Sequence, residues 1–127
     1  MSYRGACHCG RIAFEVTGEC SEVVECNCSI CRKKGYLHWI VPQTAFRLLT
    51  PADAMATYTF NTGTAKHHFC PHCGVAPFYI PRSDPDKVDV NARCLEGLNL
   101  RRVAARAFDG ENWEAAFQAY AAERGAG

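Results

Sequence analysis

The sequence predicts a single, mainly β domain of antiparallel strands that ends in a short helix. Three observations predict it. Short apolar and polar alternations recur between residues 11 and 108, turn signals separate them, and a helical apolar period occurs only near the end. The length of 127 residues fits one domain spanning residues 1–127, and no repeat, linker or low-complexity tract divides it.

The clearest strand is predicted at residues 11–18. Ile12, Phe14 and Val16 fall on one face and more polar residues on the other, which is the period of a half-buried strand. Similar runs follow at residues 36–42, 56–61, 65–70, 76–81, 87–92 and 102–108. Gly, Pro, Asn and Asp turn signals lie between them, so their spacing favours antiparallel pairing over βαβ units.

Only residues 112–124, NWEAAFQAYAAER, have a helical period. Trp113, Phe117 and Tyr120 fall at i, i+4 and i+7, and Asn112 or Gly110 is a candidate cap. This aromatic stripe is expected to dock the helix on the sheet. Residues 125–127 are expected to fray.

The composition excludes several classes of partner. Fourteen basic and thirteen acidic residues leave a formal charge of +1. This is not the excess of positive charge that binding to nucleic acid or an anionic membrane requires. With no stretch of about 18 apolar residues and no apolar leader, the chain is expected to be cytoplasmic. Nine cysteines then favour metal ligation, because the cytoplasm keeps thiols reduced. The sequence does not predict an oligomeric state.

Seven of the nine cysteines lie in three clusters: Cys7 and Cys9 in CHC; Cys26, Cys28 and Cys31 in CNCSIC; and Cys70 and Cys73 in CPHC. The other two are Cys20 and Cys94. Zn²⁺ favours thiolates, and a structural site takes four. CxxC followed by glycine is the turn of a zinc knuckle, and CxC places both sulfurs on the same side of an extended chain. The two motifs together form a natural structural zinc site. Spacing alone leaves open whether CxC instead joins the middle cluster, and a thioredoxin-like redox pair is the other interpretation of CPHC.

The middle cluster supplies three ligands. A zinc ion with three protein ligands and an open fourth position is typical of catalytic sites. Three thiolates weaken the ion as a Lewis acid, so this arrangement favours a thiol as the substrate. Alternatively, a distant residue closes the site; Cys94 is the leading candidate, with Cys20 and the histidines behind it. Two zinc ions per chain are expected.

Four stretches, GACHCG (residues 5–10), CNCSICRK (26–33), FCPHCG (69–74) and NARCL (91–95), resemble the glutathione-dependent formaldehyde-activating enzyme family in order and spacing. The resemblance covers residues 5–113, and the stretches IVPQTAFRLL, TYTFNTGTAKHHFC and GVAPFYIPRSDP are most similar to its centromere protein V branch. It implies an Mss4-like fold of two antiparallel sheets. It also implies a structural zinc site at Cys7, Cys9, Cys70 and Cys73 and a catalytic one at Cys26, Cys28 and Cys31.

The activity that the resemblance implies is that of a carbon–sulfur lyase, joining glutathione and formaldehyde reversibly to S-(hydroxymethyl)glutathione. Small-molecule thiols and aldehydes would then be the partners. The alternative hypothesis is a non-enzymatic, zinc-stabilised module that binds another protein, and a third is zinc buffering or redox sensing.

The sequence does not decide which side chains transfer protons or bind the substrate. The candidate proton donors are His38, His67, His68 and Cys94. His67 and His68 point to opposite faces of a strand, so at most one of them faces the site. The basic run 32–34, Arg32-Lys33-Lys34, could hold the carboxylates of glutathione or offset the negative charge of three thiolates.

Overall fold

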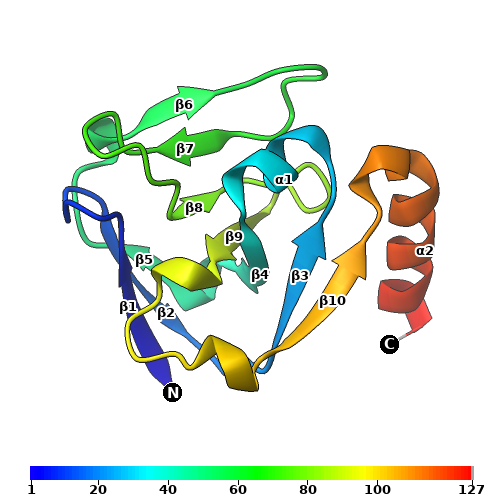
Figure 1. Cartoon of the computed structure of the whole chain (residues 1–127), viewed down its shortest axis with the longest axis horizontal. Helices are drawn as coiled ribbons and strands as arrows, with labels where there is room; N and C mark the ends of the chain where they lie inside the picture. The colour runs from blue at the N-terminus through cyan, green and yellow to red at the C-terminus, as the bar shows by residue number, and fades with distance from the viewer. Residues whose placement is uncertain (127) are drawn as a thin grey trace.

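The computed structural model describes residues 1–126, in which three small sheets carry two helices at their edges (Figure 1). The first sheet has the order β1-β2-β5, with bounds Ser2–Ala6, Ala13–Thr17 and Phe46–Leu48. The second has the order β10-β3-β4-β9-β8, with bounds Ala104–Phe108, Glu22–Cys26, Leu37–Pro42, Lys87–Asn91 and Phe78–Tyr79. The third is the hairpin of β6 (Ala56–Tyr58) and β7 (His67–Phe69).

Helical segments are short apart from the last one. The α-helices are α1 (Ser29–Lys34) and α2 (Trp113–Ala126). The 3₁₀ turns are η1 (Gln43–Ala45), η2 (Ala52–Ala54), η3 (Ala92–Cys94), η4 (Leu100–Arg102) and η5 (Gly110–Asn112). No helix within residues 1–126 is both long and apolar enough to cross a membrane.

The predicted fold class, mainly β with a short C-terminal helix, is confirmed. Several details differ. The sequence patterns missed β1, β3 and β5, because these strands are short and lack a clean alternation, and they missed α1, because six residues are too few for a helical period. The small β6–β7 hairpin adds a third sheet to the two that were expected. The strand predicted at residues 76–81 shrinks to two residues, since prolines at positions 77 and 81 cannot donate to a ladder.

One strand pair also departs from the antiparallel prediction. Strand β10 pairs with β3 in parallel, with Phe108 opposite Cys26. The long connection between them leaves room for this crossover, which a prediction based on short turns did not consider. As a result, both strands end at the same edge of the sheet.

The hydrophobic core lies between the first sheet and one face of the second. Ile12, Phe14 and Val16 are completely buried, as the alternation at residues 11–18 predicted. The Phe14 ring stacks on Phe46 with centroids 5.1 Å apart and meets Phe78 edge-on at 5.9 Å. These aromatic contacts join the two sheets.

Helix α2 docks at the end of β10, as its aromatic stripe predicted, but its aromatic residues are only partly buried (Figure 1). Tyr120 meets Phe108 edge-on at 6.3 Å and donates a hydrogen bond to Asp84 at 2.8 Å. The Trp113 ring carries the guanidinium of Arg82 at 3.7 Å. The turn η5, which includes both candidate caps, leads into the helix. Residue 127, part of the end expected to fray, lies outside the described residues.

We expect Gly5→Ala to lower the free energy of unfolding by about 1–3 kcal/mol, because a Cβ atom at residue 5 would overlap the Phe14 ring. Chemical denaturation measures this loss. In a Phe14→Leu background the same substitution should cost less, since the ring that it meets is gone. Equal costs in both backgrounds would contradict this packing.

Candidate metal centres and the cleft beside them

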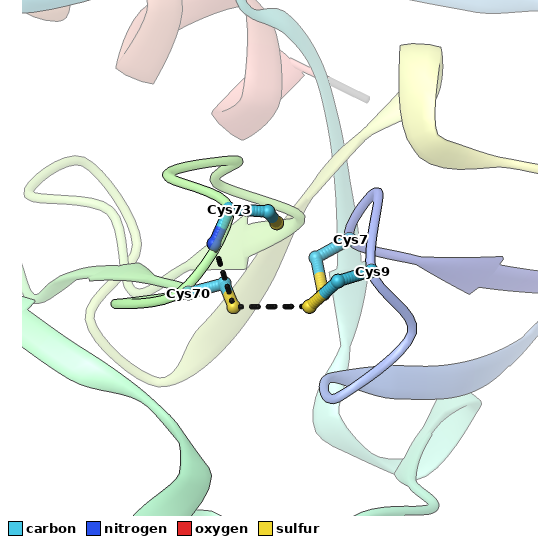
Figure 2. A group of neighbouring side chains, drawn as sticks. All are labelled: Cys7, Cys9, Cys70 and Cys73. Carbon is cyan, nitrogen blue, oxygen red and sulfur yellow. Dashed lines mark hydrogen bonds between the residues drawn. The ribbon is translucent and has the colours of Figure 1, made fainter.

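Four cysteine sulfurs converge between the start of the chain and the segment before β8. The sulfurs of Cys7, Cys9, Cys70 and Cys73 all lie within 4.8 Å of one another (Figure 2). The Cys9 sulfur is 3.7 Å from that of Cys7 and 3.6 Å from that of Cys70. Four sulfurs bound tetrahedrally at 2.3 Å would stand about 3.8 Å apart. The spacing therefore fits a four-coordinate metal ion, and CxC meets CxxC rather than the middle cluster.

Backbone turns aim these sulfurs inward. Gly74 adopts a positive φ of 78° and its N–H donates to the Cys70 carbonyl at 2.8 Å, which closes the CPHC turn. The Cys73 N–H then donates to the Cys70 sulfur at 3.5 Å, and the Ile12 N–H donates to the Cys7 sulfur at 3.4 Å. Backbone N–H groups stabilise thiolate charge, which is what a metal ligand needs.

A second group is formed by Cys26, Cys28 and Cys31, whose sulfurs also lie within 4.8 Å of one another. Cys26 ends β3, Cys28 is the N-cap of α1, and Cys31 lies in its first turn. The Cys31 N–H donates to the Cys28 sulfur at 3.4 Å. Hydrogen bonding by the Cys26 and Cys31 side chains lowers the pKa of the Cys28 thiol. Among the described residues, no fourth His, Cys, Asp or Glu joins this group within the same distance.

The turn after β10 braces this second group. Asn27 donates to Asp109 at 2.9 Å and accepts from the Glu111 N–H at 3.0 Å. Gly110 lies directly on the cysteines, and a Cβ atom there would collide with the Cys26 sulfur and with Cys28. Sequence reasoning missed this role, because Gly110 was considered only as a candidate helix cap and Asn27 was given no role.

The second group lies in the wall of a cleft of about 500 Å³, within the size range of small-molecule sites. All three of its cysteines line the cleft, and the first group does not. Five aromatic side chains also line it: Phe60, Tyr79, Phe108, Trp113 and Tyr120. A second hollow of about 440 Å³ reaches Cys26 and Cys31 from another side.

Strand register explains why these residues meet. In the second sheet Val24 pairs with His38, Phe108 with Cys26, and Tyr79 with Asp89. Because side chains alternate between faces, all of these residues lie on one face of the sheet, which is the face that lines the cleft. The other face, which includes Val90, belongs to the core.

Comparison with known proteins decides the family. A family model described as glutathione-dependent formaldehyde-activating enzyme matches residues 2–113. The chain belongs to this family. The chain is also similar to the crystal structure of a Rhodobacter sphaeroides protein, a structural genomics target, with a TM-score of 0.71 and 34% sequence identity. The match covers 80% of this chain and 98% of that chain. The resemblance found in the sequence is thereby confirmed for the family; the centromere protein V branch stays an interpretation of the sequence.

Two cationic side chains of this formaldehyde-activating family member line the cleft. Arg32, from the predicted basic run, lies 3.6 Å from Glu111. Arg82, which sequence reasoning missed, stacks on Trp113 and lies 3.6 Å from Glu114. Among the described residues that line the cleft, the other two members of the basic run, at positions 33 and 34, do not occur. The cationic heads at the cleft are therefore both arginines.

The candidate proton donors separate by position. His38 and His67 line the cleft, whereas His68 hydrogen-bonds to Thr57 at 2.9 Å, so one member of the His67–His68 pair faces the site. Burial lowers the pKa of His67 to about 4, and its ring stacks on that of Tyr79 at 4.9 Å. A histidine with that pKa is neutral at neutral pH.

Cys94 lies apart from the second group. Burial raises the pKa of its thiol to about 11, and the charges that raise it further are those of Cys7 and Cys73, in the first group. Its sulfur belongs to neither sulfur group. The prediction of Cys94 as a fourth ligand at the second group thus gains no support from its position.

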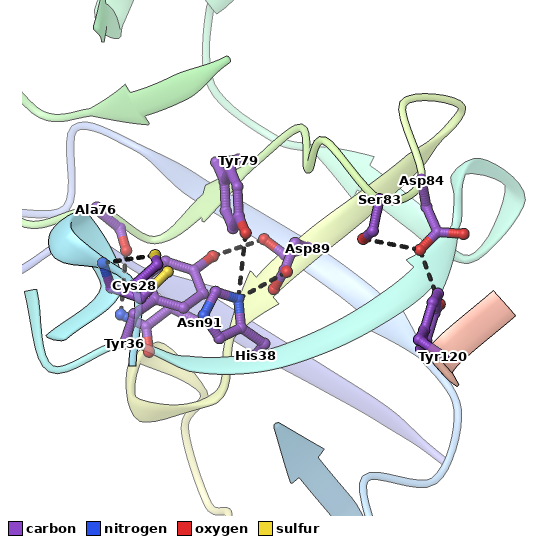
Figure 3. A network of polar contacts seen from close by, with 11 residues as sticks. Cys28, Tyr36, His38, Ala76, Tyr79, Ser83, Asp84, Asp89, Asn91 and Tyr120 are labelled. Atoms are coloured by element: carbon purple, nitrogen blue, oxygen red, sulfur yellow. Dashed lines mark hydrogen bonds and ion pairs between the residues drawn. The ribbon is translucent and has the colours of Figure 1, made fainter. Parts of the chain in front are cut away.

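A buried polar network forms part of the cleft wall (Figure 3). His38 Nδ1 lies 2.7 Å from Asp89 Oδ2, and the Tyr79 hydroxyl lies 3.3 Å from the same nitrogen. The Tyr36 hydroxyl donates to the Asp89 carbonyl at 2.6 Å. Burial raises the pKa of the Asp89 carboxyl, and His38 acts against this rise. Sequence reasoning missed Asp89, because a charged residue that alternates with valines in a strand is expected to face solvent.

We expect Cys70→Ser to remove one metal ion and to destabilise the fold strongly, since the first group joins two distant segments. Cys28→Ser should remove the other ion and shift the melting temperature by only a few degrees. Elemental analysis and thermal unfolding measure both effects. Cys20→Ala, a buried cysteine outside both groups, should keep both ions. Equal destabilisation by Cys70→Ser and Cys28→Ser would contradict the different roles.

Gly110→Ala should weaken the metal affinity of the second group by about tenfold or more, because the added methyl group displaces two of its cysteines. Competition with a chelator measures this affinity. Gly97→Ala is the matched control: it strains a glycine with a φ of 79°, and the added Cβ atom has no neighbour within 4 Å, so it contacts neither group. If both variants release metal equally, a general loss of stability is the cause, and the close contact at Gly110 is not.

Proposed function

We propose that this protein is a zinc-dependent carbon–sulfur lyase of the glutathione-dependent formaldehyde-activating type. It would reversibly join a thiol of the glutathione class and an aldehyde of the formaldehyde class into an S-hydroxymethyl adduct. The observation that carries this proposal is that a group of three cysteine sulfurs lines a cleft large enough for a small molecule.

The contrast between the two sulfur groups supports this assignment. The first has four sulfurs and lies outside the cleft, which suits a structural ion; the second has three and lies in its wall. All-thiolate sets favour Zn²⁺ among the common divalent ions, so two zinc ions per chain are proposed. Cys26, Cys28 and Cys31 would hold this second zinc ion, which would supply an open position for a thiol and lower the pKa of that thiol.

The two arginines of the cleft suit the carboxylates of a glutathione-like thiol. A guanidinium binds a carboxylate through two parallel hydrogen bonds. Arg32 and Arg82 already pair with Glu111 and Glu114, but three of these four side chains are exposed and Arg82 is partly exposed, so the pairs contribute little. A substrate carboxylate can therefore replace them at small cost. Stacking on Trp113 keeps the Arg82 head in a fixed plane.

The aromatic wall suits the carbonyl partner. Phe60, Phe108 and Trp113 present apolar rings to the cleft, which limits the water around a bound aldehyde. With less water, the charge that develops on the carbonyl oxygen interacts more strongly with nearby polar groups. The same wall would exclude bulk water from the adduct in the reverse reaction.

We expect two zinc ions per chain, and in the cobalt-substituted protein a thiolate-to-metal absorption band that shifts when glutathione is added. The shift arises because the second group offers a position that a new thiolate can take. Exchange spectroscopy by NMR would then show faster interconversion of glutathione, formaldehyde and their adduct than without protein. Cys28→Ser should abolish both the shift and the acceleration.

Two metal ions with spectra that no thiol changes would mean two closed structural sites. The proposed activity would then fail, and a non-enzymatic module that binds another protein would replace it.

A further inference from the structure

Two buried side-chain atoms in the cleft wall have no hydrogen-bond partner among the described residues: His38 Nε2 and Asp89 Oδ1. His38 is 5% exposed and Asp89 is 1% exposed. Buried polar atoms are nearly always paired in folded proteins, and the exceptions concentrate where function requires them. An unpaired imidazole nitrogen in the wall of a candidate active site is such an exception.

The partner of the other ring nitrogen defines the state of the unpaired one. Asp89 Oδ2 lies 2.7 Å from Nδ1, so a proton on Nδ1 is donated to the carboxylate. In a neutral imidazole this leaves Nε2 as an acceptor. When Nε2 takes up a proton, the carboxylate stabilises the resulting positive charge. The pair can therefore accept a proton at Nε2 and release it again.

The pair is held rigidly. His38 lies in β4 and Asp89 in β9, which pair side by side within the five-stranded sheet. The Tyr36 hydroxyl fixes the Asp89 backbone at 2.6 Å, and the Tyr36 ring lies 4.5 Å from the His38 ring. Such support keeps the imidazole in one orientation without reaching the cleft itself, because Tyr36 is not among the residues that line it.

The sheet also places this pair beside the three-sulfur group. His38 pairs with Val24, and Cys26 follows two residues later on the same strand and the same face. Two residues on neighbouring strands that are offset by two positions in this way lie about 7–8 Å apart. A small molecule that reaches the Cys26 sulfur therefore lies next to His38. Another candidate proton donor in the cleft wall, His67, has its ring stacked between Phe60 and Tyr79. Of the two cleft histidines, we therefore consider His38 the better candidate.

We infer that His38 carries the proton of the reaction through Nε2 and that Asp89 is its positioning residue; this inference rests on the proposed function. As the thiol sulfur attacks the carbonyl carbon, Nε2 accepts the thiol proton, the S–C bond forms, and the π electron pair moves to the oxygen. Nε2 then returns the same proton to that oxygen, which gives the hydroxyl of the adduct. The reverse reaction takes the hydroxyl proton and returns it to the sulfur, so no proton is gained or lost overall.

His38→Gln in the metal-loaded enzyme should lower kcat by about 10²- to 10⁴-fold in both directions, the usual contribution of a proton-transferring side chain. Asp89→Asn should lower it less, by about tenfold or more, because the imidazole remains. Both variants should keep two metal ions, the KM for the thiol and the cobalt spectral shift. Val41→Ala, which removes core packing from the same strand as His38 on the face away from the cleft, should keep the wild-type kcat and so controls for loss of packing.

Failure of the inference is distinguishable from failure of the proposed function. If the wild-type protein turns over and folded His38→Gln matches its kcat, His38 carries no proton and the inference is overturned while the function stands. Nitrogen NMR of the histidine rings in the zinc-loaded wild-type protein gives a readout without turnover and without variants. We expect His38 to be protonated at Nδ1 and its Nε2 resonance to move when glutathione is added. An unprotonated Nδ1, or a resonance indifferent to glutathione, would overturn the inference.

Discussion

The convergence of four cysteine sulfurs is the constraint on which the rest of the structure depends. It joins Cys9 to Cys70, 61 residues apart, at a distance of 3.6 Å. The first motif follows β1 directly, and the second lies between β7 and β8, so the sulfurs hold the first sheet against the edge of the second. That closure brings Phe14 of β2 onto Phe78 of β8. A chain of this size then needs only a modest core between the sheets.

The five-stranded sheet uses its two faces for different purposes. One face carries valines and Phe78 into the core, and the other carries Cys26, His38 and Asp89 into the cleft. The period of two makes this separation strict, because a shift by one residue would exchange the two sets. Parallel pairing of β10 with β3 completes the cleft face. It puts Phe108 opposite Cys26, so the turn with Gly110 reaches the three-sulfur group.

This two-sided use explains how much could be predicted from the sequence. The core face of β2 and the three cysteine motifs follow from local spacing, and the structure has both. Spacing left open which motifs meet, and the family resemblance implied the grouping that the structure has. Asp89 could not be found, because alternation reports that a residue faces away from the core without saying whether solvent or another part of the chain lies there. The same limit applies to Trp113: a helical stripe indicates contact, and part of this one borders the cleft. Gly110 was missed because nothing local reports which distant side chain a glycine must admit.

The cleft combines three kinds of side chain: cysteine sulfurs, cationic arginines and a buried polar pair. The three-sulfur group, the arginine heads of Arg32 and Arg82 and the buried His38–Asp89 pair all lie in the wall of the same cleft. Under the proposed function, an anionic thiol that binds its carboxylates to the arginines would have its sulfur free to reach the cysteines. Its sulfur would then lie next to the buried His38–Asp89 pair, where a proton could move without competition from solvent. The proposed function thus assigns recognition, sulfur binding and proton transfer to separate side chains of one sheet face and its covering turns.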